Sequence, residues 1–343
     1  MKRYFIVGGA GFIGSHLARR VADGPDASVT IYDNFSSGRL WRLGDAAQSP
    51  RVSIVRGDVK DLPALTAAMR GHDHVFHFAS NPDIARAVTQ PDIDFWEGSY
   101  LTQNVLEAMR VSGVPKLNYA SGSGVYGDTG HKAVFEDYAP LLPISTYGAS
   151  KLAGEVSICA YCHMFGLTAA AFRFANVVGP RQSHGVCFDF ILRLLRDPHD
   201  LRILGDGSQS KSYIHVDDVL DAMLLIAESQ SGGFEYFNAA TEDYVTVLQI
   251  ADLVTKRMNL TGVNYEFTGG DRGWKGDVPI VRFDTRKLRA RGWANRRTSV
   301  EALTESIDSM LADARAGRLE QPADPGAPRT AAEGKASAQG SAP

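Results

Sequence analysis

The sequence is poor in cysteine and contains no long apolar run. Its three cysteines cannot all pair with one another, so the disulfide framework of a small secreted protein is not indicated. No stretch approaches the roughly 20 apolar residues of a membrane span, and Gly8 and Gly9 interrupt the first apolar stretch too early for a signal peptide. We therefore expect a cytoplasmic protein without a membrane segment.

The sequence also lacks an excess of either charge. It has 36 Lys and Arg against 39 Asp and Glu, a formal net charge of -3. The sequence therefore has no overall positive charge that would attract nucleic acid. The residues from Gln321 onward contain no aliphatic residue larger than alanine, no Met, no aromatic residue and no cysteine. Such a segment cannot bury enough apolar surface to offset its ordering entropy, and we predict a disordered tail over residues 316–343.

Short apolar runs alternate with helical patterns through the first half of the 343 residues. Runs of strand length lie at residues 3–7, 29–32, 52–55, 75–78 and 116–120, with amphipathic patterns at 12–22, 62–69 and 99–111. This alternation is typical of an α/β fold, a Rossmann-type parallel sheet with helices on both faces. It weakens after about residue 178, which predicts a smaller C-terminal lobe.

The predicted domains follow from that change. Residues 1–177 are predicted to form a Rossmann domain, and residues 178–315 are predicted to form the smaller lobe. Segments near 213–240 are expected to return to the first domain, so the boundary is not a single point in the sequence.

A glycine-rich turn lies between the first predicted strand and the first predicted helix. Gly8, Gly11 and Gly14 follow a GxxGxxG spacing, which allows a tight turn, close approach of the backbone to a pyrophosphate and free N–H groups at the helix start. Asp33 ends the second predicted strand, near the offset at which an acid binds the adenosine ribose. Because its charge would repel the 2′-phosphate of NADP, the pattern favours NAD.

Tyr147 and Lys151 lie four residues apart, on one face of a predicted helix. A free tyrosine, with a pKa near ~10, is a poor base at neutral pH. A nearby ammonium and the positive nicotinamide ring favour the phenolate and so should lower this pKa. We therefore expect Tyr147 to be a catalytic base and acid.

Several segments together resemble the extended short-chain dehydrogenases/reductases, specifically the NAD-dependent nucleotide-sugar epimerase/dehydratase family in its UDP-glucose 4-epimerase-like form. They occur in family order over about residues 3–310 and read GGAGFIG (8–14), DNFSSG (33–38), GDV (57–59), FHFAS (76–80), VYGD (125–128), STYGASK (145–151), FRFANVVGPRQ (172–182), GDGSQSKSYIHVDDV (205–219) and GWKGDVPIVRFDT (273–285).

The resemblance implies a role for each matching position. Tyr147 is the expected base, Lys151 binds the nicotinamide ribose, and Asn176 holds the diphosphate end of the sugar nucleotide. The expected NAD-binding residues are Gly8, Gly11, Phe12, Ile13, Gly14, Asp33, Asn34, Ser36, Gly38, Asp58, Val59, Phe78, Ala79, Ser80, Tyr147 and Lys151. The expected substrate-binding residues are Ser121, Ser123, Asn176, Lys211 and Arg272.

One departure from the family pattern concerns the hydroxyl that contacts the sugar O4. Gly122 occupies that position, between Ser121 and Ser123. Strand alternation sends both serine side chains to the same side, opposite Gly122. We predict that Ser123 reaches the sugar and add it to the catalytic residues; the alternatives are that the hydroxyl is dispensable or that both serines only bind the loop.

Other departures affect the choice of reaction and the diphosphate contacts. Ser123 and Gly124 stand where family dehydratases and decarboxylases carry acids, so the general acid for eliminating water is missing. Lys211 replaces an arginine and loses its bidentate geometry. Trp274 replaces another arginine, and either Arg272 or the nearby Lys275 could supply that contact.

Three other patterns have structural interpretations, and no metal site is predicted. Cys159 and Cys162 form a CxxC in the middle of a helix, where two packed thiols are expected rather than a redox pair. His74 and His77 differ in parity and should face opposite sides of the sheet. His215 is expected to end a strand and cap a helix.

We expect NAD-dependent epimerisation of a nucleotide-diphosphate sugar, UDP-hexose by preference, at C4 through a 4-keto intermediate. A dehydratase or decarboxylase of the same family and a catalytically silent NAD-binding regulator are the alternatives. A homodimer is expected because the helices at 99–111 and 151–165 carry apolar residues on more than one face.

Overall fold

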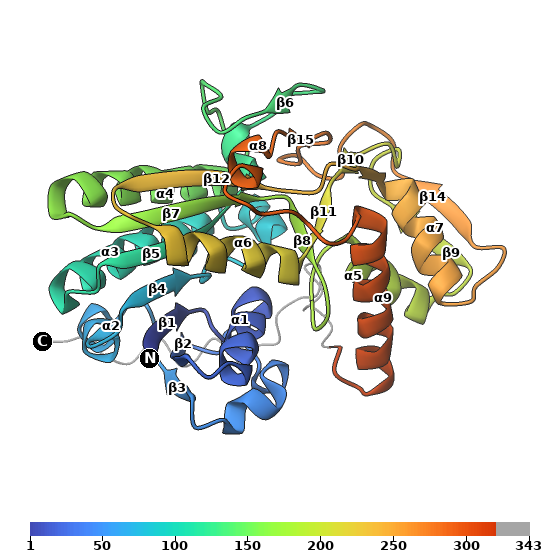
Figure 1. Cartoon of the computed structure of the whole chain (residues 1–343). Helices are drawn as coiled ribbons and strands as arrows, with labels where there is room; N and C mark the ends of the chain where they lie inside the picture. Colours follow the sequence, from blue (N-terminus) through green and yellow to red (C-terminus); the bar gives the residue numbers. More distant parts are fainter. Residues whose placement is uncertain (320–343) are drawn as a thin grey trace, which may run out of the picture.

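A seven-stranded parallel sheet forms the centre of the molecule, in the strand order β12-β7-β5-β4-β1-β2-β3. The computed structural model describes residues 1–319, and Figure 1 shows this sheet with helices packed on it and a smaller lobe beside it. The strands are β1 (Lys2–Val7), β2 (Ala27–Asp33), β3 (Val52–Arg56), β4 (His74–His77), β5 (Lys116–Gly122), β7 (Thr168–Phe174) and β12 (Phe234–Ala239). The predicted tail lies outside the described residues from residue 320 onward.

Alternate residues of each strand face two separate apolar cores. In β1, Tyr4 and Ile6 join one core while Phe5 and Val7 join the other. Helices α1 (Phe12–Asp23) and α6 (Val216–Ser229) pack in the first core, and α2 (Leu62–Met69), α3 (Tyr100–Ser112) and α4 (Thr146–Phe165) pack in the second. The predicted Rossmann-type arrangement with helices on both faces is confirmed.

A third apolar core lies in the C-terminal lobe, among α5 (Val186–Arg196), α7 (Val247–Arg257) and α9 (Ser299–Arg315). Its short strand pairs are β9 (Asp200–Ile203) with β14 (Asn264–Phe267), and β10 (Ser210–Lys211) with β13 (Val245–Thr246). Two further pairs are β8 (Asn176–Val178) with β11 (Tyr213–His215), and β6 (Ala133–Val134) with β15 (Arg282–Phe283). The short helix α8 (Arg286–Arg289) and the turns Leu40–Arg42, Gly44–Gln48, Ile84–Val88, Phe95–Ser99 and Ser123–Tyr126 complete the described elements.

The chain enters the lobe and then returns to the sheet. After β7 it runs through α5, β9 and β10, comes back through β11 and α6, and adds β12 beside β7. It then enters the lobe a second time with α7. The division into domains at residues 1–177 and 178–315 stays a prediction.

Helix α4 carries the predicted catalytic pair, and a capping residue closes each of its ends. The Ser145 side chain accepts a hydrogen bond from the backbone N–H of Gly148 at 3.1 Å, which satisfies one of the free donors of the first turn. Gly166 closes the helix with a φ of 73°, a left-handed conformation that glycine adopts without steric cost. Tyr147 therefore lies in the first turn, where the helix meets the carboxyl ends of the strands.

No helix among residues 1–319 is long and apolar enough to cross a lipid bilayer.

Candidate active site

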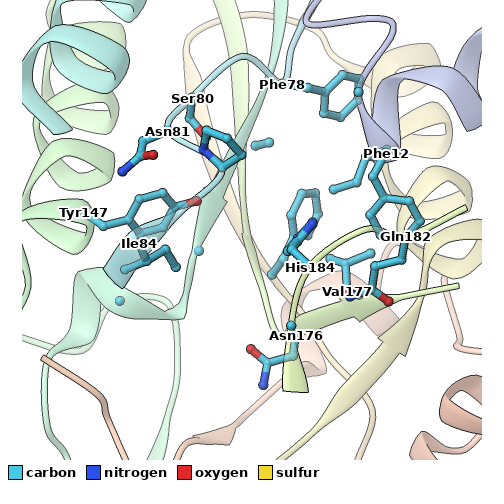
Figure 2. A pocket seen from close by; sticks show the side chains of 18 of the residues that line it. Phe12, Phe78, Ser80, Asn81, Ile84, Tyr147, Asn176, Val177, Gln182 and His184 are labelled. Atoms are coloured by element: carbon cyan, nitrogen blue, oxygen red, sulfur yellow. Dashed lines mark hydrogen bonds between the residues drawn. The ribbon is translucent and has the colours of Figure 1, made fainter. Parts of the chain in front are cut away.

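A cavity of about 630 Å³ runs from the glycine-rich turn to the C-terminal lobe. The carboxyl ends of the central strands and the loops that follow them supply one side, and the lobe supplies the other. Figure 2 shows Ser80, Asn81 and Tyr147 on one wall, with Phe12, Gln182 and His184 facing them. In open parallel sheets, ligands bind at this edge.

The glycine-rich turn packs so closely that side chains are excluded. A Cβ at Gly14 would lie 2.5 Å from the carbonyl oxygen of Gly8, and a Cβ at Gly8, whose φ is +78°, would lie 2.7 Å from the backbone nitrogen of Ala79. The first turn of α1 has no side-chain cap at Gly11. Its N–H groups are therefore available to an anion, so the turn has the form that a dinucleotide pyrophosphate needs.

Asp33 ends β2 at the rim of this turn. Its carboxylate accepts hydrogen bonds from the N–H groups of Ala10, at 2.9 Å, and Phe35, at 2.8 Å. Gly38 packs against it, because a Cβ there would lie 2.6 Å from Asp33 Oδ1. Asp33 lines the cavity, whereas Gly38 is not among the lining residues. Gly38 thus supports the acid rather than facing the cofactor space.

The other predicted cofactor-binding residues face the same cavity. They are Gly8, Gly11, Phe12, Ile13, Gly14, Asn34, Ser36, Asp58, Val59, Phe78, Ala79, Ser80, Tyr147 and Lys151. The group comes from five separate segments of the chain, which the sheet brings to one edge. These residues fit a dinucleotide with one end at the glycine-rich turn and the other near Tyr147.

Lys151 anchors the catalytic helix to the sheet. Its ammonium donates a hydrogen bond to the carbonyl oxygen of Ala120 at 2.8 Å. It also lies 5.4 Å from the ring centroid of Tyr147 and 5.2 Å from that of Tyr119. Burial lowers the pKa of Lys151 to about 8, although the charges of Asp94 and Glu155 oppose this shift. The amine is thus held at the cavity, below the phenol ring.

The protein's own groups raise the pKa of Tyr147. Burial raises it, a hydrogen bond with the Ser80 side chain lowers it, and the charge of Asp94 raises it further. Lys151 faces the ring rather than the hydroxyl, so its charge does not offset desolvation. The protein's own groups therefore favour the neutral phenol, and the lowered pKa expected beside a bound nicotinamide ring stays a prediction.

Ser121 and Ser123 lie in different surroundings. Strand β5 ends at Gly122 and a 3₁₀ turn begins at Ser123, so the alternation expected for a continuous strand does not extend to Ser123. The Ser121 hydroxyl donates to Glu155 at 2.5 Å, and Glu155 is itself paired with the buried Arg173. Both serines line the cavity. Because the Ser121 hydroxyl already donates to Glu155, the Ser123 hydroxyl is the better placed of the two to bind a ligand.

The lobe contributes a second set of polar groups. Asn176 begins β8 and is exposed to the cavity (Figure 2). Lys211 lines the cavity and pairs with Asp277 at 2.5 Å. Arg272 is not among the lining residues. It pairs with Asp128 and donates to the carbonyl oxygen of Asp277 at 2.8 Å, so it ties two loops together near the cavity mouth.

Several cavity residues are not identifiable from the motifs. Asn81, His184 and Arg193 lie in the lining. Trp274 also lines the cavity and covers Gly276, since a Cβ there would lie 2.4 Å from its ring. The only sequence signal for Trp274 is the departure from the family's arginine.

The three patterns with structural interpretations are placed as expected. Cys159 and Cys162 are free thiols within α4. His74 bonds Asn118, while His77 bonds Thr102 of α3 on the opposite face of the sheet. His215 caps α6, accepting from the N–H of Asp217 at 3.1 Å. Among residues 1–319, no group of three or more His, Cys, Asp or Glu side chains could hold a metal ion.

Comparisons with known proteins agree with this geometry. Residues 4–240 match the model of the NAD dependent epimerase/dehydratase family. A UDP-glucose 4-epimerase from Mycolicibacterium smegmatis is 37% identical over 247 residues, which cover 70% of this chain and 77% of that protein. A dTDP-glucose 4,6-dehydratase from Streptomyces antibioticus is 29% identical over 311 residues, covering 88% and 90% of the two chains.

The fold is also shared with a solved structure of a UDP-galactose 4-epimerase. The TM-score is 0.81 at 36% identity, and the alignment covers 91% of this chain and 99% of the other. The family predicted from the motifs is confirmed by these matches. The chain belongs to the NAD dependent epimerase/dehydratase family.

Proposed function

We propose that the protein is an NAD-dependent 4-epimerase of a nucleotide-diphosphate sugar, with UDP-hexose as the preferred substrate class. The observation that carries this proposal is one cavity that holds the glycine-rich turn at one end, Tyr147 beside Ser80 in the middle, and the polar groups of the lobe at the other end. That order suits a cofactor and a sugar nucleotide that meet at Tyr147.

NAD is the family cofactor, and when bound it would supply the acceptor for the C4 hydride and the hydride for its return to the other face of the sugar. We assign its binding to the predicted cofactor residues that face the cavity, with Gly38 in the supporting role described above. The Asp33 carboxylate would repel a 2′-phosphate, which favours NAD over NADP. Residues 1–177 would serve the cofactor and residues 178–315 the sugar nucleotide, with segments near 213–240 returning to the first part.

Tyr147 exchanges the proton of the sugar O4 in this mechanism. Its hydroxyl oxygen takes the proton as C4 is oxidised, and gives it back after the 4-keto sugar has turned within the lobe. Lys151 holds the nicotinamide ribose and places a positive charge below the phenol. The protein's own groups raise the pKa of Tyr147, and a bound, positively charged nicotinamide ring would favour the phenolate.

Ser123 is the residue we assign to the sugar hydroxyl: Ser121 and Ser123 both line the cavity, but the Ser121 hydroxyl already donates to Glu155. Asn176 and Lys211 are assigned to the diphosphate end. Ser121 and Arg272 already have partners in Glu155 and Asp128. We therefore assign them to the support of the loops around the substrate, and direct contact by either would require these pairs to open.

The loop that carries Ser123 also argues against a dehydratase or a decarboxylase. Ser123 and Gly124 offer no acidic side chain, and elimination of water needs a general acid. The silent regulator is disfavoured because Tyr147 and Lys151 are both present and both line the cavity.

A screen of nucleotide sugars with the purified protein, read by chromatography and mass spectrometry, separates the three functions. A product of equal mass and altered retention indicates an epimerase. Loss of water or CO₂ indicates the dehydratase or decarboxylase, and no turnover of any nucleotide sugar indicates the regulator.

We further propose that the enzyme is a homodimer and acts in the cytoplasm. The exposed apolar side chains Val156 and Met164 on α4, and Trp96 just before α3, are the groups that a second subunit would cover. The free thiols of Cys159, Cys162 and Cys187 suit a reducing compartment.

A further inference from the structure

Asp94 is a buried acid next to the catalytic helix, outside the motifs that identify the family. Its exposed fraction is 1%. It lies just before a π-helical turn, Phe95–Ser99, which leads into α3. Burying a carboxylate is costly unless hydrogen bonds compensate, so its partners indicate what the residue does.

Both oxygens of Asp94 accept a hydrogen bond from a neutral side chain. Oδ1 accepts from the amide nitrogen of Asn81 at 2.8 Å, and Oδ2 accepts from the hydroxyl of Thr146 at 2.6 Å. Asn81 is held in turn by Asp83, whose N–H donates to the Asn81 side-chain oxygen at 3.0 Å. The carboxylate thus joins the loop after β4 to the first turn of α4.

These contacts form a ring of residues behind the proposed catalytic hydroxyl. Thr146 directly precedes Tyr147, and Asn81 directly follows Ser80, while Ser80 and Tyr147 lie on the same wall of the cavity (Figure 2). The ring therefore consists of Asp94, Thr146, Tyr147, Ser80 and Asn81. The same carboxylate holds the neighbours of both Tyr147 and Ser80.

The charge of Asp94 also reaches the catalytic pair. Its two hydrogen-bond donors are neutral, and its negative charge raises the pKa of both Tyr147 and Lys151. The other titratable groups around this pair are Glu155 on α4, Tyr119 on β5 and His77 on β4. Among these groups, Asp94 is the one whose charge affects the pKa of both Tyr147 and Lys151. It also accepts a hydrogen bond from Thr146, the residue before Tyr147.

We propose that Asp94 is a positioning residue of the reaction, which ties the loop after β4 to the first turn of α4 and so orients Tyr147 against Ser80. This inference rests on the proposed function only for its kinetic consequence. Its effect on the phenol belongs to the protein itself and can be measured without any substrate.

The first experiment titrates the phenol in the purified protein. The absorbance of tyrosinate is followed against pH in the wild type and in Asp94→Asn, and the same titration on Tyr147→Phe backgrounds isolates the contribution of Tyr147. Because a negative charge is removed, the Tyr147 transition should move to lower pH in Asp94→Asn. Asp92→Asn is the matched control, since Asp92 is an exposed acid of the same segment, and it should leave the transition unchanged. An identical Tyr147 transition in Asp94→Asn and wild type would overturn the proposal.

The second experiment measures kcat and KM against pH on a nucleotide sugar that the wild type epimerises. Asp94→Asn should lower kcat roughly tenfold or more with little change in KM, because misplacing a reacting group by about 1 Å can cost up to ~10²-fold. The acidic limb of the kcat profile should move to lower pH with the phenol.

Thr146→Val keeps the charge but removes one hydrogen bond of the ring. It should lower kcat without moving the Tyr147 transition, and Thr146→Ser, which keeps the hydroxyl, should restore kcat. These variants also test the ring if Asp94→Asn does not fold. A fully active Thr146→Val variant would contradict the proposed ring, whereas a wild type that turns over no sugar would contradict the proposed function and leave the phenol titration as the test of Asp94.

Discussion

The ammonium of Lys151 donates a hydrogen bond to the carbonyl oxygen of Ala120 at 2.8 Å. Ala120 is the residue before Ser121-Gly122-Ser123, so this bond joins the catalytic helix to the strand end that carries the sugar-facing serine. Helix α4 and the end of β5 therefore keep a fixed spacing. Substitutions at Tyr147 and at Ser123 can thus be compared in the same active-site geometry.

Tyr147→Phe should remove the proton exchange while keeping the cofactor site. We expect kcat to fall by about 10²–10⁴-fold, the usual contribution of a positioned acid or base, with NAD still bound. Tyr161→Phe, a change of the same kind near the end of the same helix, should stay active. The check is kcat on the preferred nucleotide sugar together with the NAD content of each variant, and full activity of Tyr147→Phe would overturn the mechanism.

The cofactor preference should depend on Asp33. We expect the wild type to bind NAD more tightly than NADP, because the Asp33 carboxylate faces the space expected for the adenosine ribose. Asp33→Asn should reduce this preference, whereas Asp45→Asn, an exposed acid nearby, should not. Dissociation constants for both cofactors provide the measurement, and equal wild-type affinities would show that Asp33 has another role.

The loop at Gly122 tests how the sugar is held. A Cβ at Gly122 would meet nothing within 4 Å, and the φ of −166° suits any residue, so Gly122→Ser should fold normally. Ser123→Ala should lower kcat less than Tyr147→Phe does, because Ser123 orients the sugar without taking its proton. Gly122→Ser should not increase the rate; a large gain would indicate that the wild-type site is impaired and would support the regulator.

Acid should destabilise the fold through buried histidines. Burial lowers the pKa of His74 from 6.5 to about 4. Between about pH 6.5 and pH 4, His74 is therefore protonated in the unfolded chain but neutral in the folded chain. The free energy of unfolding falls through this window by up to about 1.4 kcal/mol per pH unit.

Urea unfolding at a series of pH values checks this contribution. His74→Gln should have a shallower loss of stability between pH 6.5 and 4. His131→Gln, on an exposed loop, should keep the wild-type slope. Equal slopes in all three proteins would mean that His74 is protonated in the folded state.

The proposed dimer places α4 in contact with a second subunit. Val156 is 62% exposed and Met164 is 72% exposed, so a charge at Val156 would be buried unpaired in the interface. Val156→Arg should shift the mass in solution toward the monomer, while Val300→Arg, an exposed valine of α9, should leave it unchanged. A wild type that is monomeric at micromolar concentration would argue against the dimer.

The sheet and the cofactor turn could be predicted because their signals are local. An apolar run such as residues 3–7 has few alternatives to a buried strand, and the spacing of Gly8, Gly11 and Gly14 reflects contacts within one turn. Tyr147 and Lys151 are four residues apart on one helix, so their common face follows from helical geometry.

The remaining parts of the site depend on contacts between distant segments. Asp94 meets Thr146 across 52 residues, and no spacing rule connects them. The raised pKa of Tyr147 results from burial, which depends on the whole cavity wall. The alternation of side chains along a strand could not predict the surroundings of Ser121, because β5 ends one residue later. The Ser121 hydroxyl donates instead to Glu155, which is 34 residues away in the sequence.

The late arrival of β12 in the sheet has a consequence for synthesis on the ribosome. Strand β7 is buried along most of its length and pairs with β5 on one side and with β12, residues 234–239, on the other. During synthesis, β5 is made before β7, but β12 is made about 60 residues after it. A nascent chain that ends after β7 would present an unpaired edge rich in alanine and phenylalanine, the kind of edge that pairs with other chains. The first two thirds of the protein thus need protection from aggregation until the chain has passed through the lobe and returned. Fragments cut near residue 177 should therefore collect in inclusion bodies to a greater extent than the full-length chain.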